Sequence, residues 1–369
     1  MRTLFYCKLF LFLGLLWPGP TLAAAEPYLT APAAILMEVN NGQVLYELQA
    51  RQEREPASTT KIMTAILALE LGQLDMPVRV SEYAATTPGT TIYLTIGETL
   101  KLSELIKGAL INSGNDAATA IAEGLAGSES TFAWLMNRKA RQLGAYNTSF
   151  KNPHGLTEAG HYTSAYDLAI MTRYALRNPF FSKTVATKEA QISAPDGIRF
   201  LYNTNRLLDS YPGCDGVKTG TTDAAGQCLV ASATRGGRQL LSVVLGSSER
   251  YSDSCALLDY GFENFYAEMA LAGENCGQVY VNGGETAAVA VAPETTVSFT
   301  VPKEEAALLE KRLILPAAVN APVKEGQQLG EVVILYKGQE VVSSALIATG
   351  EVRTLPWWSR LLMFASRGL

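Results

Sequence analysis

Histidine and cysteine are scarce in this chain. Among 369 residues there are two histidines, His154 and His161, and five cysteines, and their spacing matches no zinc-binding pattern. Neither histidine is tied by sequence or spacing to a serine nucleophile, which disfavours a Ser-His-Asp triad. We therefore interpret both histidines as groups that fix loops, and a nucleophile would need another kind of base.

The chain also lacks blocks of basic residues. Its 30 lysines and arginines are outnumbered by 35 acidic residues, which gives a net charge of −5. A nucleic-acid partner requires a concentrated positive patch, so this balance argues against nucleic acid as a ligand.

Long apolar runs are scarce as well. Residues 1–25 combine Arg2 and Lys8, the apolar run Leu9–Trp17 and three alanines before Glu26, a pattern typical of a cleaved secretory signal peptide. The run is shorter than the ~20 residues that span a bilayer, so cleavage is favoured over a membrane anchor. The mature chain would keep 28 basic and 35 acidic residues, a net charge of −7, and would be exported.

A serine and a lysine stand three residues apart in the segment P-A-S-T-T-K, residues 56–61. On a helix this spacing places Ser58 and Lys61 on one face, within hydrogen-bond reach. Apolar residues follow and favour burial of the lysine, and a buried amine loses its proton more readily and can act as the base for a serine. Alone the pair is a weak signal, because a helix-start serine near an exposed lysine gives the same pattern.

Two further stretches strengthen this interpretation. Ser113 and Asn115 fall at a pause between two helical patterns within residues 99–126, where they could face a site instead of capping a helix. Lys218 and Gly220 stand in a predicted strand, and a glycine there marks close approach by a ligand or another backbone. A peptide could bind as an added strand along this edge.

The remaining patterns predict a mixed domain of helices and antiparallel strands. Residues 28–48 alternate around Asn41-Gly42, which predicts a β-hairpin with a type I′ turn. Helices are predicted over 130–143 and 165–176, and strands over 215–221, 227–233 and 239–246.

The cysteines of the mature chain raise the question of a disulfide. Cys214 and Cys228 flank the hairpin formed by strands 215–221 and 227–233 and could face each other across it. Because exported proteins can form disulfides, a Cys214–Cys228 bond is a hypothesis, with two free thiols as its alternative. Cys255 is predicted to be buried on a helix, and Cys276 has no evident partner.

The composition changes towards the C-terminus. Residues 271–352 contain short valine-rich strands separated by glycine and proline turns, which predicts a small all-β, sandwich-like domain with a docking or spacer role. Residues 353–369 place tryptophan and leucine on one helical side and arginine on the other. This segment is predicted to be an amphipathic helix that binds the membrane surface, with packing on the protein as the alternative.

The ordered motifs S-x-x-K, S-x-N and K-T-G resemble those of penicillin-binding proteins. With the H-G-L segment at His154, Arg250 and the β-rich second region, the chain resembles the low-molecular-mass D-alanyl-D-alanine carboxypeptidases over most of its length. The resemblance implies a penicillin-binding, β-lactamase-like α+β domain over 26–270, with a central antiparallel sheet flanked by helices. It implies no cofactor or metal, and action at the extracytoplasmic face of the membrane or in the cell wall.

The resemblance also assigns the chemistry to residues. Ser58 would attack the carbonyl between two terminal D-alanines of a peptidoglycan pentapeptide, and Lys61 would take its proton. Ser113 would relay a proton to the leaving amine, while Lys218 keeps its surroundings positive. Asn115 would bind the peptide backbone.

The end of the substrate would meet the K-T-G strand. By resemblance, Thr219, Thr221 and Arg250 would bind the terminal carboxylate, next to Gly220. The backbone N–H groups of Ser58 and Thr221 would form the oxyanion hole. A β-lactam should acylate the same serine, because its strained amide mimics the D-Ala-D-Ala bond.

Three alternatives stay open at this point. A class A β-lactamase shares the motifs, but its Glu-x-x-x-Asn loop is not recognisable between Asn115 and Lys218. A D,D-endopeptidase would use the same residues on cross-linked peptides. A peptidoglycan-binding protein with an inactive site is the non-enzymatic alternative, although every expected catalytic side chain is present.

Overall fold

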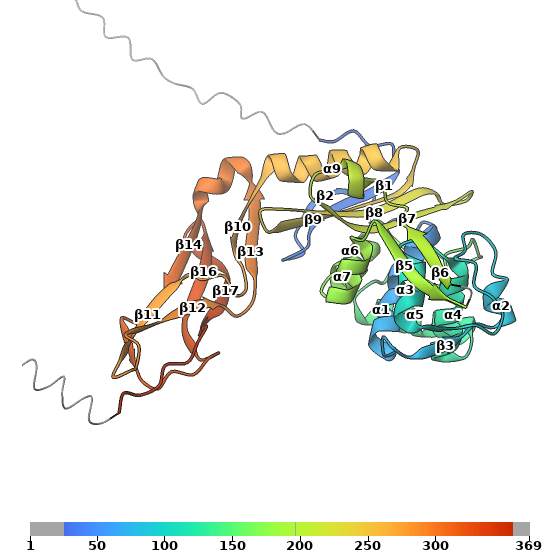
Figure 1. Ribbon diagram of the computed structural model, residues 1–369. Helices are drawn as coiled ribbons and strands as arrows, with labels where there is room; N and C mark the ends of the chain where they lie inside the picture. Colours follow the sequence, from blue (N-terminus) through green and yellow to red (C-terminus); the bar gives the residue numbers. More distant parts are fainter. Residues whose placement is uncertain (1–25, 196, 357–369) are drawn as a thin grey trace, which may run out of the picture.

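The computed structural model describes residues 26–195 and 197–356. A five-stranded antiparallel sheet with the order β2-β1-β9-β8-β7 lies at the centre of the larger region (Figure 1). Its strands are β1 Ala33–Glu38, β2 Val44–Leu48, β7 Cys214–Thr222, β8 Gly226–Arg235 and β9 Arg238–Ser247. Helix α9, Arg250–Asn264, covers one face of the sheet, and the other helices lie mainly on the opposite face (Figure 1).

Alternate residues of the inner strand β1 contribute to two different cores. Ala33, Ile35 and Met37 pack into the core shared with the helical layer, whereas Ala34 and Leu36 pack into the core beneath α9. Successive side chains of a strand point to opposite faces, so a strand covered on both sides is apolar throughout. This explains why the first five residues of β1 are apolar and buried. The sixth, Glu38, is also buried, and it is bonded to Arg238.

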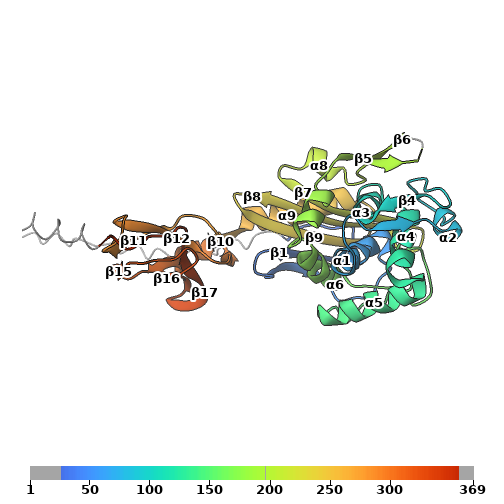
Figure 2. The same cartoon turned by 60° about the horizontal axis from the view of Figure 1, so that its bottom comes forward.

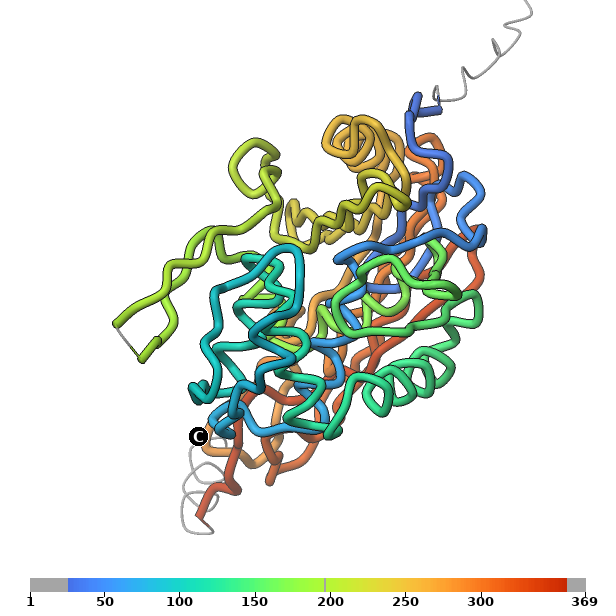
Figure 3. The backbone as a smooth tube through the Cα atoms, turned by 90° about the vertical axis from the view of Figure 1, so that its right-hand side faces the viewer, coloured from blue at the N-terminus to red at the C-terminus, as the bar shows by residue number. Residues whose placement is uncertain are grey.

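The helical layer is built from short helices. Its helices are α1 Lys61–Leu71, α2 Glu82–Ala85, α3 Leu102–Leu110, α4 Asn115–Ala126, α5 Glu129–Gln142, α6 Ala165–Ala175 and α7 Pro179–Val185, and residues 143–164 form a long connection between α5 and α6. The short helix α8 Leu207–Ser210 packs instead into the core beneath α9. A small sheet pairs β3 Pro77–Arg79 with β4 Thr99–Lys101, and a hairpin pairs β5 Glu189–Ala194 with β6 Gly197–Tyr202. Figure 3 shows this hairpin standing out from the body of the domain.

The predicted helices and central strands are confirmed, including the break between α3 and α4. The β1–β2 hairpin is also confirmed, but its turn is not type I′. A type I′ turn needs positive φ at both central residues. Gly42 has a φ of +80°, whereas Asn41 is not among the residues with positive φ, and the Glu38 amide donates to the carbonyl of Gln43 across a longer loop. The Asn41 carboxamide oxygen accepts the Gln43 amide, which stabilises this wider turn.

The proposed Cys214–Cys228 disulfide is wrong, because both residues are free thiols in the structure. The register pairs Cys214 with Ala233 and Cys228 with Gly220, so the two cysteines lie at different heights along the β7–β8 ladder. Burial raises the pKa of both thiols to about 11. Cys255 lies on α9 as expected but is only partly buried.

The C-terminal region is all-β apart from one short 3-10 turn, η2 Lys303–Leu308, within the residues that the structure describes. A six-stranded sheet has the order β14-β16-β17-β12-β11-β15, and β10 pairs with β13 beside it. These strands are β10 Phe265–Ala270, β11 Gly277–Asn282, β12 Ala288–Pro293, β13 Val297–Pro302, β14 Leu309–Ile314, β15 Ala318–Asn320, β16 Gln328–Tyr336 and β17 Gln339–Ala348. Figure 2 shows this region at one end of an elongated molecule.

Polar contacts join the two regions where β1 and β9 meet β10 and β13. The Arg238 Nε donates to Glu38 Oε1 at 2.8 Å, and the Thr300 hydroxyl donates to the same oxygen at 2.9 Å. Arg238 also donates to the carbonyl of Phe265 at the start of β10. Gln43 pairs with both backbone groups of Thr300. The two sheets are therefore connected by specific hydrogen bonds as well as by the chain.

The expected signal peptide at 1–25 lies outside the described residues, and so does most of the expected amphipathic helix at 353–369. Among the described residues, no helix is both long and apolar enough to cross a membrane.

Candidate active site

Ser58 lies on a short 3-10 turn, η1 Ala57–Thr60, which leads directly into α1. It is partly exposed, while Ala57 and Thr59 on either side are buried. Ala57 has a φ of +48°, a left-handed conformation that costs a residue with a side chain about 1–3 kcal/mol. The surrounding structure must hold this turn in place, and it does so from two sides.

Glycines allow two segments to approach the Ser58 turn closely. A Cβ on Gly220 of β7 would lie 2.8 Å from the Ser58 nitrogen, and a Cβ on Gly155 would lie 1.8 Å from the Ala57 carbonyl oxygen. Gly155 also has a φ of +89°. Only glycine fits at these contacts, so strand β7 and the 152–156 loop enclose the turn.

Lys61 is completely buried, one turn beyond the serine. Its Nζ lies 2.9 Å from the Ser58 hydroxyl, 2.6 Å from the Asn115 Oδ1 and 2.8 Å from the His154 carbonyl oxygen. Burial, followed by the nearby charge of Lys218, lowers the pKa of Lys61 well below its ordinary value. The neutral amine is thereby favoured.

The three partners of Lys61 can all be satisfied by a neutral amine. Such an amine has two N–H donors and one lone pair, and the oxygens of Asn115 and His154 can only accept. If each takes one N–H, the lone pair remains for the hydroxyl proton of Ser58. This arrangement can remove a proton from the serine, as the spacing of the two residues suggested.

Asn115 and Ser113 are delivered by the break between α3 and α4. The Asn115 amide nitrogen donates to the Pro88 carbonyl at 2.7 Å, while its oxygen accepts from Lys61. Ser113 is buried with a φ of +65°, and its hydroxyl makes no hydrogen bond within the described part of the chain. Asp116 is also buried and accepts from the amides of Ile92 and Leu94, which fixes the loop beside the break.

The K-T-G stretch lies on β7 next to the serine turn. Lys218 is buried and donates to the Thr219 carbonyl at 2.9 Å. Burial and then Arg250 lower the pKa of Lys218 to about 7, so it is charged in only part of the molecules at neutral pH. The Thr219 hydroxyl lies 2.6 Å from that of Thr204.

Arg250, the first residue of α9, reaches across to the same strand. Its Nη1 donates to the Gly220 carbonyl at 3.0 Å and to the Thr221 hydroxyl at 2.8 Å. Its Nε is buried and has no hydrogen-bond partner among the described residues. A buried cationic donor without an acceptor is costly, which suits a site that receives an anion.

His161 supports the Ser58 turn through a chain of hydrogen bonds. The Lys151 amide donates to its Nδ1 at 3.0 Å, so the neutral ring carries its proton on Nε2, which lies 2.9 Å from the Thr60 hydroxyl. That hydroxyl donates to the Ala57 carbonyl at 2.8 Å. Burial, followed by His154 and Lys151, lowers the pKa of His161 to about 4 and keeps the ring neutral.

His154 holds the loop whose carbonyl accepts from Lys61. Its Nδ1 accepts the Leu156 amide, and its Nε2 lies 3.2 Å from the Glu129 carboxylate. The two histidines therefore fix loops, as their scarcity and position suggested, and both act next to the serine.

The structure brings Lys61 to the Ser58 hydroxyl and Asn115 to Lys61, and it places Gly220 against the Ser58 turn. Ser113 lies two residues before Asn115, and Lys218, Thr219 and Thr221 flank Gly220 on β7. Sequence analysis assigned no role in the site to Asp116, Gly155 or Thr204, although Gly155 belongs to the H-G-L segment. Asp116 could have been noticed because it extends the S-G-N stretch, and Gly155 because it follows His154. Nothing local in the sequence marks Thr204.

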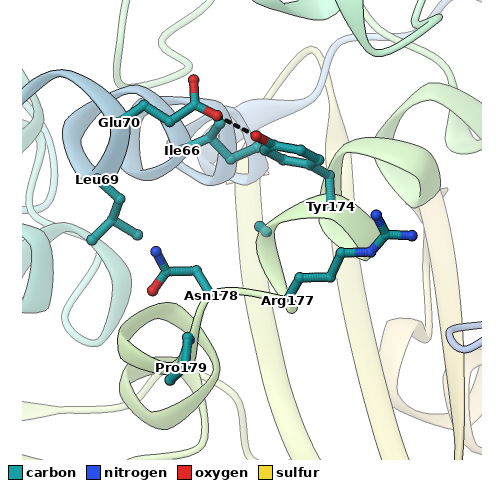
Figure 4. Close-up of a pocket in the computed structure, with 8 residues that line it drawn as sticks. Ile66, Leu69, Glu70, Tyr174, Arg177, Asn178 and Pro179 are labelled. Carbon is teal, nitrogen blue, oxygen red and sulfur yellow. Dashed lines mark hydrogen bonds between the residues drawn. The ribbon is translucent and has the colours of Figure 1, made fainter. Parts of the chain in front are cut away.

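A separate surface pocket of about 300 Å³ lies at the other end of α1, between α1 and the α6–α7 connection (Figure 4). Its acid Glu70 is already bonded, to the Tyr174 hydroxyl at 2.5 Å and to Lys139 at 2.6 Å. Asn178 on the opposite side caps α7. The acid of this pocket is therefore not available to a ligand, although Arg177 also lines the pocket.

Comparison with known proteins agrees with this geometry. The model of the D-alanyl-D-alanine carboxypeptidase family (peptidase family S11) matches residues 21–249, and that of the penicillin-binding protein 5 C-terminal domain matches residues 266–354. The D-alanyl-D-alanine carboxypeptidase DacF of Bacillus subtilis (strain 168) is 39% identical over 334 residues, covering 88% of this chain and 86% of the relative. DacC of Escherichia coli (strain K12) is 32% identical, covering 94% and 91%.

Solved structures give the same result. Penicillin-binding protein 5 from Haemophilus influenzae superposes with a TM-score of 0.67 at 31% identity, covering 90% of this chain and all of that one. The fold and the site thus define a serine enzyme of the penicillin-binding class. Within that class, the chain belongs to the D-alanyl-D-alanine carboxypeptidase family.

Proposed function

We propose that this protein is a serine carboxypeptidase that removes the terminal D-alanine from peptidoglycan stem peptides. The observation that carries the proposal is the buried Lys61 Nζ, which lies 2.9 Å from the Ser58 hydroxyl and is held by the Asn115 and His154 carbonyl oxygens. The family membership supplies the substrate class. Among solved relatives, proteins with this fold are described as penicillin-binding proteins, so a β-lactam is proposed as an inhibitor that acylates Ser58.

The reaction proceeds through an acyl-enzyme. Ser58 attacks the carbonyl carbon of the penultimate D-alanine as Lys61 takes the hydroxyl proton. The C–N bond then breaks, and Ser113 passes a proton to the departing amine of the last D-alanine. Water hydrolyses the ester and releases the shortened peptide. Lys218 keeps the surroundings of Ser113 positive in the fraction of molecules in which it is protonated.

Fixed donors orient the substrate. The guanidinium of Arg250, held beside Thr221, binds the terminal carboxylate, and Thr219 and Thr221 add hydroxyl donors. The N–H groups of Ser58 and Thr221 stabilise the developing oxyanion, and such donors contribute about 3–4 kcal/mol each. Asn115 has one amide hydrogen left for the peptide backbone after bonding to Pro88 and Lys61.

The substrate places the enzyme outside the cytoplasm. We propose that residues 1–25 direct export and that residues 353–369 attach the C-terminal region to the membrane surface as an amphipathic helix. A chain ending near Arg353 should then no longer sediment with membranes, and continued sedimentation would contradict the helix as the attachment.

The decisive experiment measures release of free D-alanine from a diacyl-L-Lys-D-Ala-D-Ala peptide. The parent protein is run beside Ser58→Ala and beside protein treated with penicillin. Release that disappears in both cases supports the carboxypeptidase. A stable penicillin adduct on Ser58 without release would indicate an endopeptidase, rapid hydrolysis of penicillin a β-lactamase, and neither reaction an inactive binding protein.

A further inference from the structure

A second hollow lies on the outer side of α5, away from the α1 pocket. It has a volume of about 640 Å³ and is formed by α5 together with residues 146–151 and Tyr162. We call it the α5 pocket. Figure 2 shows α5 along the outer edge of the helical layer. Its size is within the range of about 300–1,000 Å³ that is usual for ligand sites.

Three aromatic rings and three cations line the α5 pocket. The aromatic residues are Trp134, Tyr146 and Tyr162, and the cations are Arg138, Arg141 and Lys151. Trp134 is 60% exposed and Tyr146 is 77% exposed, although large rings are normally covered in a folded protein. The guanidinium of Arg138 lies 5.7 Å from the centre of the Trp134 ring.

The polar ends of these side chains are unused. Within the described residues, the side chains of Arg138, Arg141 and Lys151 form no hydrogen bond or salt bridge. The hydroxyls of Tyr146 and Tyr162 are likewise without partners there. This contrasts with the α1 pocket of Figure 4, where the acid is bonded from two sides. The α5 pocket therefore keeps its donors available for a ligand.

The floor of the pocket is held firmly. The Asn137 carboxamide bonds both backbone groups of Phe150, at 2.8 Å and 2.7 Å. The Thr148 hydroxyl donates to the Asp167 carboxylate at 2.7 Å. These bonds fix the backbone of residues 148–150, which forms the floor of the pocket, without using the exposed cations. A ligand therefore does not have to order this floor.

We propose that the α5 pocket binds an anionic glycan, namely a peptidoglycan strand with its carboxylate-bearing stem peptides. Aromatic faces of mixed apolar and polar character suit the C–H faces of sugar rings. The arginines suit carboxylates, which they bind through paired N–H donors. This choice of glycan rests on the proposed function, because that function brings the enzyme to peptidoglycan.

The pocket is connected to the site by one short loop. The Lys151 amide bonds His161, and Ser149 pairs with Tyr162. The same loop includes His154, whose carbonyl accepts from Lys61. A strand held in the α5 pocket would thus lie beside the loop that builds the active site and would raise the local concentration of stem peptides there.

Binding is tested with the whole chain from which residues 1–25 have been removed. Ser58 is first acylated by penicillin so that the active site cannot hold substrate. The retention of this protein on insoluble peptidoglycan stripped of phosphate polymers is measured over a range of concentrations. We expect Trp134→Ala/Arg138→Ala/Arg141→Ala to weaken retention about tenfold or more, and raising the salt concentration to weaken the parent. The matched control Arg177→Ala, in the α1 pocket, should bind as the parent does.

Two readouts separate this proposal from the proposed function. The triple variant should still react with penicillin and cleave a soluble tripeptide at the parental rate, which also shows that it is folded. If penicillin does not acylate the parent, the proposed function fails, while retention can still be measured with Ser58→Ala.

Equal retention of the parent and the triple variant would overturn the proposal. Retention only on walls that keep their phosphate polymers would also overturn the proposal, because the ligand would then be a phosphate polymer. If the triple variant lost binding to anionic lipid vesicles as much as it lost retention on peptidoglycan, the ligand would be a membrane surface. Arg138→Lys/Arg141→Lys keeps the charge but not the paired donors, and should fall between the parent and the triple variant.

Discussion

The two regions of the molecule bury very different groups. The catalytic region buries charged or titratable side chains next to one another, including Lys61, Asp116, His161 and Lys218. In the described part of the C-terminal region, the buried polar residues are only Ser298, Thr300 and Ser344, around a core of valine, leucine, isoleucine and alanine. Burial of a charge costs free energy unless it is compensated. The catalytic region therefore accepts that cost around Ser58, and also at the junction, where Glu38 and Arg238 are buried as a pair.

Removal of the Lys61 amine should have the largest effect on catalysis. Lys61→Met keeps the length of the side chain but offers no lone pair to Ser58, so acylation by penicillin should slow by about 10²–10⁴-fold, the usual contribution of a general base. Lys311→Met in the C-terminal region, which removes a partly exposed amine paired with Glu268, is the matched control and should acylate at the parental rate. Acylation of Lys61→Met at the parental rate would contradict the assignment.

The pH profile sharpens this prediction. Only the neutral amine can accept the proton, so the acylation rate should rise with pH through the pKa of Lys61. Burial lowers that pKa well below its ordinary value, so the rise should come at a pH far below that at which an exposed lysine titrates. The rise should be absent in Lys61→Met, and an identical profile in that variant would assign it to another group.

Removal of the cation from α9 should have the next largest effect. Arg250→Gln deprives the terminal carboxylate of a charge-assisted donor worth about 1.5–3 kcal/mol, so kcat/KM for the tripeptide should fall roughly 10–100-fold. Arg312→Gln is the control, because Arg312 is exposed and pairs only with its neighbour Glu310. With a peptide whose C-terminus is amidated, Arg250→Gln and the parent should have similar kcat/KM values. If kcat/KM for this peptide falls as much as for the free acid, Arg250 acts on something other than the carboxylate.

The neutral His161 gives a smaller, pH-dependent effect. Its folded-state pKa of about 4 lies below the ordinary value of 6.5, so between these values the unfolded chain binds a proton that the folded one does not. The stability contributed by His161 is therefore complete above pH 6.5 and is lost as the pH falls towards 4, by roughly 3 kcal/mol in total. Glutamine cannot titrate. The free energy of unfolding of His161→Gln, measured in urea, should therefore fall less steeply than that of the parent as the pH is lowered from 6.5 to 4.

The same residue links stability to the nucleophile. His161→Ala removes the support of Thr60 and, through it, of the Ala57 turn, which should slow acylation about tenfold for one lost hydrogen bond. His161→Gln, which can still donate, should retain most of the rate. If alanine and glutamine behave alike at pH 7, the hydrogen-bond chain does not position Ser58.

Much of this site could be predicted from the sequence because its elements are local. Ser58 and Lys61 are separated by less than one helical turn, and Gly220 stands out within a strand pattern. The contacts that complete the site are not local. His161 meets Thr60 across 101 residues and Asn115 meets Lys61 across 54. No pattern of period two or 3.6 encodes such pairs.

Register shows the same limit. The β7–β8 hairpin was predictable from alternation and from its turn residues, yet the opposition of Cys214 and Cys228 was not. The bulge between Cys214 and Gly216 and the position of the turn set which residues pair, and a symmetric placement about the hairpin does not specify them. The type of the β1–β2 turn was missed for a related reason. Asn41 stabilises the turn through its side chain, which accepts the Gln43 amide, and its backbone does not adopt the positive φ of a type I′ turn.

A change in the C-terminal core should have the smallest effect on catalysis. Ile334→Ala empties a fully buried position on β16 and should lower the free energy of unfolding of that region by about 2–5 kcal/mol. Acylation by penicillin should be unchanged wherever the catalytic region stays folded. The matched variant Ile35→Ala, equally buried on β1, should instead lower the stability of the catalytic region and the fraction of protein that acylates. If Ile334→Ala reduces acylation as much as Ile35→Ala does, the bonds of Glu38 and Arg238 at the junction couple the two regions into one cooperative unit. The different buried groups of the two regions would then not separate the stability of the C-terminal region from catalysis.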